Sequence, residues 1–438
     1  MNNFQTILIA VFLAFFVFAV LVFSGAINMP NIFGNKDTGT ASGNVVVWGT
    51  FPNTVFETSI DNISSANKDL NLSYSQKNIS TYQQDLVEAF ANGTGPDLFI
   101  ITPDMIKKNT NFISKMPYTN YPRKAFTDLF IDGASIYLDS DGIIGYPLMV
   151  DPVVLYYNKD ILSNESIVYP PTTWDELFNL SSKLIKKGKD GNITQGMVAL
   201  GQYDNVNHAK DILSMLLLQS NNPIAIPLDK GYRSTLKDSA ANGSNSMEQI
   251  VNFFLEFSNP SNESYSWNRS LPNSLDMFTS GKLAFYIGYG SELFNIESIN
   301  PNLSFNVAEI PKTKGTNIRR TYGNFHSIFV SKKSANMAVA QSVAAMITED
   351  NFLKELSIRT SLPTAKRSLL ADKPSDAYLS TFFDQAIISR SWLDPNDGKT
   401  DSIFRELIEN SLSNKFSVSS SVDKAHNQLD LILKNIYE

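Results

Sequence analysis

The chain of 438 residues is too long for one ordinary hydrophobic core, so its length favours two domains. Hydrophobic residues make up 43% of it and aromatic residues 11%, which is typical of a folded globular protein and not of a disordered one. The formal net charge of -7 argues against nucleic-acid binding, which needs a basic face. The chain has no cysteine and only three scattered histidines, so disulfides and thiolate catalysis are excluded, and we expect neither a metal site nor a cofactor.

The beginning of the chain predicts a membrane anchor followed by a stalk. Residues 7–23 form an unbroken apolar run, at the short end of the roughly 17–25 residues that span a bilayer as a helix. No Lys or Arg precedes this run and a small-residue cleavage site is weak, so an uncleaved single-pass helix is favoured over a cleaved secretory signal. Residues 34–44 are rich in Gly, Thr, Ser and Asn, which is typical of a flexible linker.

The segment after the predicted stalk has the pattern of a βαβ unit. Residues 45–48 predict a first strand and residues 98–101 a second, buried one. Between them, apolar side chains recur at helical spacing up to Gly93, and Ser80 with Gln83 fits a capping box at the start of this helix. Ligands of such sheets bind where strands end in loops, so the ends of both strands are candidate site positions.

Residues 145–160 are the most informative stretch. Pro147 and Pro152 bracket one carboxylate, Asp151, and residues 153–157 then form a β-branched and aromatic run that predicts a buried strand. Because proline fixes its own φ and restricts the residue before it, Asp151 is held in a defined place beside that strand. From these residues alone, a solvated acid at a strand entry and a functional carboxylate are equal alternatives.

Three later stretches also have a clear pattern. Residues 173–187 predict a helix that begins at a capping box of Thr173 and Glu176 and ends at two lysines and a glycine. Residues 278–291 predict a helix end, a turn and a strand that leads into glycines, which allow a ligand to approach the backbone closely. Residues 322–334 predict a strand that leads towards a long helix.

In this order and at this spacing, the segments resemble the maltose-binding type of bacterial extracytoplasmic solute-binding proteins, the receptors of ABC sugar importers. The motifs that carry the resemblance are Trp48-Gly49, Gly95-Pro96-Asp97, Tyr146-Pro147 through Tyr157-Asn158-Lys159-Asp160, Thr173-Trp174-Asp175-Glu176-Leu177, Phe278 through Gly290, Gly323 through Ser334, and Leu362-Pro363. The resemblance implies a periplasmic-binding-protein-like α/β fold, in which two α/β lobes are joined by a hinge, preceded here by one N-terminal transmembrane helix. The implied ranges are 1–43 for the anchor and stalk, 44–149 with 288–332 for lobe 1, and 150–287 with 333–438 for lobe 2.

The resemblance also implies which positions face the ligand. Asp104 and Asp151 match acids of the family's cleft, and a carboxylate can accept hydrogen bonds from two neighbouring sugar hydroxyls. Two aromatic platforms of the family fall on Ile101 and Ser291, which cannot stack on a sugar ring, and Tyr289 is a candidate substitute. This departure argues against a linear malto-oligosaccharide. The expected ligand-binding residues are Trp48, Thr50, Phe51, Gln83, Asp104, Asp151, Tyr203, Asp204, Tyr289, Ser291, Asn324 and Trp392.

The role of the two tryptophans in this set is open, because ordinary core packing is an equal alternative for Trp48 and Trp392.

We therefore expect a receptor and not an enzyme. It would be a monomer tethered to the outer face of the cell membrane by its N-terminal helix. It would bind a polar small molecule, a sugar by resemblance, and deliver it to ABC permease subunits. One alternative is an anchored sensing or adhesion module with the same fold, since fold does not fix function. The other is a glycoside-cleaving enzyme, for which Asp104 and Asp151 would be the two carboxylates.

Overall fold

The structure is a computed structural model that describes residues 42–228, 231–239 and 245–434. Residues 1–41, which hold the predicted membrane helix and most of the linker predicted at residues 34–44, lie outside the described residues. Gly43 and Asn44, the last two residues of that predicted linker, already belong to the first strand. Among the residues that the structure describes, no helix combines the length and the apolar character that a membrane crossing requires.

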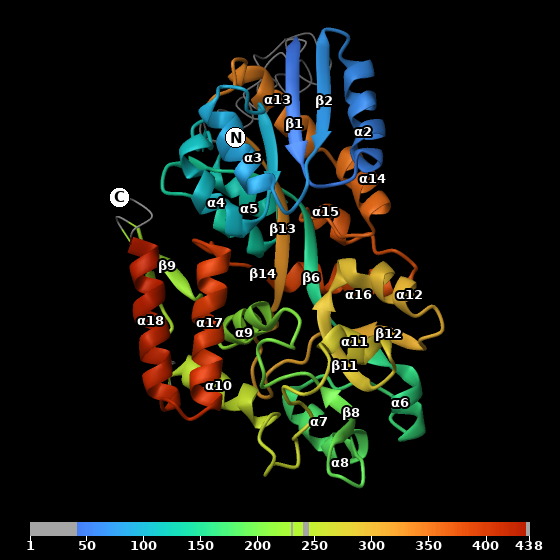
Figure 1. Cartoon of the computed structure of the whole chain (residues 1–438). Helices are drawn as coiled ribbons and strands as arrows, with labels where there is room; N and C mark the ends of the chain where they lie inside the picture. Colours follow the sequence, from blue (N-terminus) through green and yellow to red (C-terminus); the bar gives the residue numbers. More distant parts are fainter. Residues whose placement is uncertain (1–41, 229–230, 240–244, 435–438) are drawn as a thin grey trace, which may run out of the picture.

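A ten-stranded sheet runs through the whole molecule (Figure 1). Its main path has the order β2-β1-β3-β13-β6-β11-β8-β7, while β12 pairs with β6 and β14 pairs with β13. Strands β1, β2 and β3 are parallel, and β13 is antiparallel to both β3 and β6. The strands of this sheet are β1 (Gly43–Gly49), β2 (Leu70–Gln76), β3 (Leu98–Ile101), β6 (Tyr146–Asn158), β7 (Lys186–Lys187), β8 (Ile193–Val198), β11 (Leu283–Tyr289), β12 (Phe305–Ala308), β13 (Thr321–Val330) and β14 (Ser389–Arg390).

The long strand β6 connects two lobes, and the sequence explains its course. It extends the strand predicted at residues 153–157 backwards through both prolines to Tyr146. Proline has no N–H to donate to the ladder, and the register between β6 and β13 shifts beside Pro147. Its side chains are buried along nearly the whole length, as expected for a strand covered on both faces.

Helices cover both faces of the sheet in each lobe (Figure 1). The core of the first lobe consists of two clusters, one around Val45 and Val343 and the other around Phe99 and Phe329. The helical elements of this lobe are α2 (Asn53–Ala66), α3 (Tyr82–Ala91), α4 (Pro103–Asn109), η1 (Thr110–Phe112), α5 (Arg123–Leu129), η2 (Asp132–Tyr137), α13 (Met337–Ile347), α14 (Asp350–Thr360) and α15 (Arg367–Leu370).

The second lobe has one large core, which includes Tyr156, Trp267 and Phe404. Helix α16 (Ala377–Ile388) lies against β6 and β12 and contributes to the cores of both lobes. Two antiparallel pairs of short strands complete the fold, β4 (Met116–Pro117) with β5 (Gly142–Ile143) in the first lobe and β9 (Ala225–Pro227) with β10 (Tyr232–Ser234) in the second. The other helical elements of this lobe are α6 (Lys159–Asn164), α7 (Trp174–Asn179), α8 (Ser181–Leu184), α9 (Ala209–Gln219), α10 (Ser246–Glu256), α11 (Ser274–Thr279), η3 (Gly290–Glu292), α12 (Leu293–Ile299), α17 (Asp397–Leu412) and α18 (Val418–Lys434).

The packing differs from the predicted lobe ranges in two places. The elements η3, α12 and β12, within the range expected for lobe 1, belong to the second lobe. Strand β12 pairs with the second-lobe end of β6, and Ile296 of α12 and Phe305 of β12 belong to the second-lobe core. Helices α13, α14 and α15, within the range expected for lobe 2, contribute Val343, Leu353 and Leu370 to the core of the first lobe. The cause is that β13 carries the chain back into the first lobe, and the chain leaves it again at residues 389–394.

Two local predictions require correction. The predicted helix over residues 173–187 is shorter, because α7 and α8 end at Leu184 and the two lysines that follow pair with β8 as strand β7. Its capping box is confirmed in part, since the Thr173 hydroxyl accepts a hydrogen bond from the Glu176 N–H at 3.2 Å. The capping box at Ser80 is wrong, because the Ser80 hydroxyl instead donates to Asn78 Oδ1 at 2.8 Å.

We expect Gly133→Ala to destabilise the fold by about 1–3 kcal/mol, because overpacking forces neighbouring atoms to move. A Cβ at Gly133 would lie 2.4 Å from the Ser389 carbonyl oxygen and 2.6 Å from the Phe325 ring. Denaturant unfolding measures the change. The matched control is Gly398→Ala in the exposed first turn of α17. A Cβ there would meet Asn396 Oδ1 at 4.0 Å, an ordinary contact, so the substitution should stabilise the helix by about 0.5–1 kcal/mol. Equal effects of the two substitutions would contradict the close packing of residue 389 on η2.

Candidate ligand-binding site

A cavity of about 330 Å³ lies between the two lobes, where β1 and β3 of the first lobe end. Both lobes and the crossing strand β13 contribute to its wall, which is the arrangement expected of a ligand site at the carboxyl ends of strands. Its lining residues are Thr50, Ile79, Tyr82, Ile100, Ile101, Thr102, Asp104 and Met105 from the first lobe, Tyr322, Asn324 and His326 from β13, and Lys210, Asp211, Tyr289, Asp394 and Asp397 from the second lobe.

A buried ion pair forms the second-lobe wall of this cleft. Lys210 Nζ donates to Asp394 Oδ2 at 2.8 Å and also pairs with Asp397, so the first turn of α9 is tied to the start of α17. The Thr400 hydroxyl and the Asn396 N–H donate to the same Asp394 carboxylate. The side chains of Lys210 and Asp394 are only 10% and 3% exposed, and these bonds replace the water that both charges lose.

Two further carboxylates, Asp104 and Asp211, line the cleft. Burial raises the pKa of Asp104, and the negative charges of Asp397 and Asp394 across the cleft raise it further, against the Thr102 hydroxyl that donates to it at 2.5 Å. Burial also raises the pKa of Asp211, which accepts a hydrogen bond from the Tyr289 hydroxyl at 2.9 Å. The cleft thus offers carboxylate oxygens from both lobes, and these can accept hydrogen bonds from ligand hydroxyls.

Aromatic and neutral polar groups complete the wall. Burial lowers the pKa of His326 to about 4, so its imidazole is neutral near pH 7 and can both donate and accept a hydrogen bond. Its ring packs against Phe51 with 4.9 Å between the ring centroids. The rings of Tyr82, Tyr289 and Tyr322 add apolar surface beside the polar groups. This mixture suits a polar solute with apolar faces.

Comparison with known proteins identifies the family. The profile of the bacterial extracellular solute-binding proteins matches residues 57–351. The chain belongs to this family. The family predicted from the sequence is therefore confirmed, and its members are non-enzymatic transport receptors.

Relatives of this solute-binding protein include the galactooligosaccharide-binding protein of Bacillus subtilis, which is 24% identical over 287 residues, 64% of this chain and 62% of that protein. A putative binding protein of Brucella abortus is 26% identical over 272 residues, 59% of this chain and 60% of that protein. The aligned part thus spans about three fifths of the length of these curated relatives.

Solved structures confirm the fold of the solute-binding protein. A cyclo/maltodextrin-binding protein complexed with maltotetraose superposes with a TM-score of 0.71 at 15% identity, covering 90% of this chain and 98% of that one. The cyclic alpha-maltosyl-1,6-maltose binding protein from Arthrobacter globiformis gives a TM-score of 0.73 at 17% identity, covering 90% and 100%. The periplasmic-binding-protein-like fold expected from the sequence is therefore confirmed.

Four of the predicted ligand-binding residues line the cleft of the solute-binding protein. Thr50 directly follows β1, Asp104 lies in the first turn of α4 just beyond β3, Tyr289 ends β11, and Asn324 lies in β13. Asn324 is the register partner of Asp151 on the neighbouring strand. The ligand roles of these residues remain predictions, and the structure brings them to one cavity.

Asp151 and Ser291 lie together but outside the residues that line the cavity. The Ser291 N–H donates to Asp151 Oδ1 at 3.0 Å, and the Asp151 side chain is buried within the crossing strand β6. Asp104 and Asp151 therefore do not both line one cavity, as the carboxylates of a glycoside-cleaving site would.

The remaining first-lobe candidates make other contacts. Trp48 lies beneath the ammonium group of Lys77, with 3.5 Å from Nζ to the ring centroid. Phe51 packs in the core of its lobe. Gln83 accepts a hydrogen bond from the Asn109 side chain at 2.8 Å.

Tyr203 and Asp204 contact α17 in the second lobe. The Tyr203 hydroxyl donates to Asp401 Oδ1 at 2.7 Å, and Asp204 forms an ion pair with Arg405. Neither residue lines the cleft cavity.

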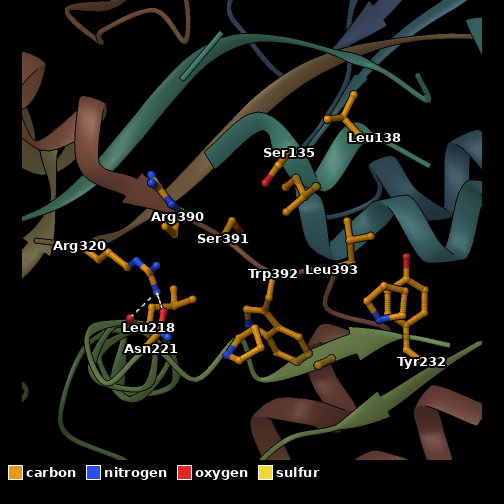
Figure 2. A pocket seen from close by; sticks show the side chains of 14 residues that line it. Ser135, Leu138, Leu218, Asn221, Tyr232, Arg320, Arg390, Ser391, Trp392 and Leu393 are labelled. Carbon is orange, nitrogen blue, oxygen red and sulfur yellow. Dashed lines mark hydrogen bonds between the residues drawn. The ribbon is translucent and has the colours of Figure 1, made fainter. Parts of the chain in front are cut away.

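Trp392 lines a different cavity of about 400 Å³, together with Tyr232, Arg320 and Arg390 (Figure 2). Its side chain is 3% exposed and packs in the core of the second lobe, which is the packing alternative named for it above. Only two residues later, Asp394 lines the ligand cleft, so the segment that returns to the second lobe passes between the two cavities.

The sequence interpretation missed Lys210, Asp211, Tyr322, Asp394 and Asp397, which line the cleft. Part of the signal was present, since Asn396 caps α17 by accepting from the Lys399 N–H, and acids cluster at that helix start. The pairing of Lys210 with an acid 184 residues later has no local signal.

Proposed function

We propose that the protein is a membrane-tethered receptor of an ABC importer, which binds a carbohydrate between its lobes and delivers it to permease subunits. The observation that carries the proposal is the cleft, in which carboxylates of both lobes face one cavity beside tyrosine rings and the Asn324 amide. Carboxylate pairs and aromatic faces suit the hydroxyls and the apolar faces of a sugar. The names of the relative from Bacillus subtilis and of both structural neighbours support a sugar ligand.

The proposed mechanism is closure of the two lobes around the bound sugar. The lobes are connected by β6, β13 and residues 389–394, which can act as the hinge. A ligand that contacts Asp104 on one side and the second-lobe wall on the other binds the closed form better than the open form. Its differential affinity then shifts the population towards closure.

A thermal-shift screen of the purified full chain tests the proposal, with mono-, di- and oligosaccharides as candidates and amino acids and peptides as controls. A ligand at 100 times its dissociation constant stabilises the folded state by about 2.7 kcal/mol, which raises the unfolding temperature measurably. We expect a saturable shift with one class of sugar and no product after incubation. A shift with amino acids or peptides alone would overturn the sugar assignment.

We expect Asp104→Asn to weaken binding of that sugar by about 1–3 kcal/mol, roughly 5- to 150-fold, because a charged acceptor is lost from the cleft. Isothermal titration calorimetry measures the change. Since burial, and after it the acids across the cleft, already disfavour the ionised form of Asp104, the unliganded variant should be no less stable than the unaltered protein. The control is Asp128→Asn, whose exposed carboxylate pairs with Lys124 far from the cavity. Unchanged affinity in a folded Asp104→Asn variant would remove Asp104 from the site.

A further inference from the structure

The chain contains eleven Asn-x-Ser/Thr tripeptides in which the middle residue is not proline. This tripeptide is the acceptor motif for N-linked glycosylation of surface loops in exported proteins. Because the motif is short, its place in the structure decides whether it can be used. The asparagines are Asn62, Asn71, Asn78, Asn92, Asn164, Asn179, Asn192, Asn242, Asn262, Asn268 and Asn302.

The described motif asparagines lie on the outside of both lobes. Asn242 lies outside the described residues, eight of the other ten are exposed, and Asn262 and Asn268 are partly buried. None of the ten is among the residues that line the ligand cleft. Asn78 is the chain neighbour of Ile79, which lines the cavity, whereas Asn92 and Asn302 are distant in the chain from every lining residue, so a bulky polar group on either of these two would leave the entrance to the cavity open.

Local structure separates the better acceptors from the poorer ones. Asn92 is exposed in the turn that ends α3, beside Gly93 with a φ of 72°, and Asn302 is exposed in the turn between α12 and β12. By contrast, Asn62 lies inside α2, and the side-chain amide of Asn71 in β2 donates to Asn44 Oδ1 at 3.1 Å. The Asn268 amide is also occupied, because it donates to the Tyr265 hydroxyl at 3.0 Å. In a turn, the asparagine amide and the Ser or Thr hydroxyl two residues later can enter the active site of a glycosyl-transferring enzyme together. In a regular helix or strand they cannot.

We propose that the protein is N-glycosylated, with Asn92 on the first lobe and Asn302 on the second as the principal sites. The co-reactant is an oligosaccharide linked to a lipid phosphate, acted on by a membrane-bound transferase on the outer face. A bond forms between Asn Nδ2 and the anomeric carbon, the bond from that carbon to the phosphate oxygen breaks, the amide loses one proton, and the lipid phosphate leaves. The proposal rests on the outer-face location and not on the identity of the transported solute.

Peptide mass spectrometry of the full chain, purified from membranes of the organism that makes it, tests the proposal. We expect peptides with Asn92 and Asn302 to carry a glycan mass and to release sugar fragment ions. Asn259 is the internal control, since it is exposed in the same loop as Asn262 but is followed by Pro260, which blocks the motif. Recovery of the Asn92 and Asn302 peptides only at their unmodified masses would overturn the proposal.

A pair of substitutions at one position sharpens the test. Thr94→Ala destroys the motif of Asn92, whereas Thr94→Ser keeps it and changes the side chain by one methyl group. Produced in the same organism, the alanine variant should lose one glycan mass and the serine variant should keep it. A difference of only one oxygen atom between the masses of the two variants would show that Asn92 carries no glycan. The sugar-binding screen gives its result on unglycosylated protein as well, so a failure of either proposal is distinguishable from a failure of the other.

Discussion

Replacing Lys210 by methionine should lower the free energy of unfolding by about 3–5 kcal/mol, the cost of breaking a buried ion pair by removing one partner. Methionine fills much of the space of the lysine stem but leaves the Asp394 carboxylate, whose side chain is 3% exposed, without its cation. Asp397, which pairs with the same ammonium group, loses its partner as well. Denaturant unfolding of the unliganded protein measures the change.

Two further variants test whether the loss of stability comes from the buried ion pair. Lys124→Met removes an ion pair with Asp128 whose side chains are 83% and 62% exposed, so it should change stability by less than about 1 kcal/mol. The double variant Lys210→Met with Asp394→Asn should regain part of the loss, because residue 394 then carries no buried charge without a cation. If Lys210→Met lowered the free energy of unfolding as little as Lys124→Met, the prediction would be wrong. The hydrogen bonds from Thr400 and Asn396 would then be enough to stabilise the buried Asp394 carboxylate, and the ion pair would not contribute to stability.

The parts of the fold that could be predicted are those with local signals. The strands at residues 45–48 and 98–101 and the crossing strand around Asp151 were found because β-branched and aromatic runs bounded by Pro and Gly have few alternatives. The Thr173 cap was found because a cap is an interaction over three residues. The prediction that this helix continues beyond Leu184 was wrong because the structure there depends on a contact that is not local. Pairing with β8 outweighs the helical preference of Lys186 and Lys187.

The parts that could not be predicted depend on contacts between distant segments. Whether α13 and α14 join the first or the second lobe is decided by the direction in which β13 runs, which no local pattern records. Tyr203 and Asp204 were expected in the cleft, but Asp401 and Arg405 of α17 hold their side chains instead. The family resemblance gave the position of the cleft in the fold better than it gave the side chains that line it.

The second prediction with a large expected effect is that Asp151 makes the stability of the folded protein depend on pH. Burial raises the pKa of Asp151 to about 7, against the hydrogen bonds from the Ser291 hydroxyl and N–H, while the negative charge of Glu292 raises the pKa further and the positive charge of His208 lowers it. In the unfolded chain an aspartate releases its proton near pH 3.9. Between about pH 4 and 7 the folded state therefore binds more protons than the unfolded state, so this residue makes stability fall as pH rises through that window.

Asp151→Asn should abolish this fall, because asparagine does not ionise and can still accept the Ser291 N–H. The variant should match the stability of the unaltered protein near pH 4 and exceed it at pH 8 by roughly 2–4 kcal/mol.

His326 on the neighbouring strand has the opposite effect on the pH dependence of stability. Its pKa of about 4 lies below the unfolded value of about 6.5, so it makes stability rise with pH between these values. In a His326→Gln background this opposing rise is absent, so the net fall of stability between pH 4 and 6.5 should be steeper. Unfolding temperatures measured from pH 4 to 8 decide the matter, and parallel curves for the unaltered protein and the Asp151→Asn variant would mean that this carboxylate is already ionised in the folded protein.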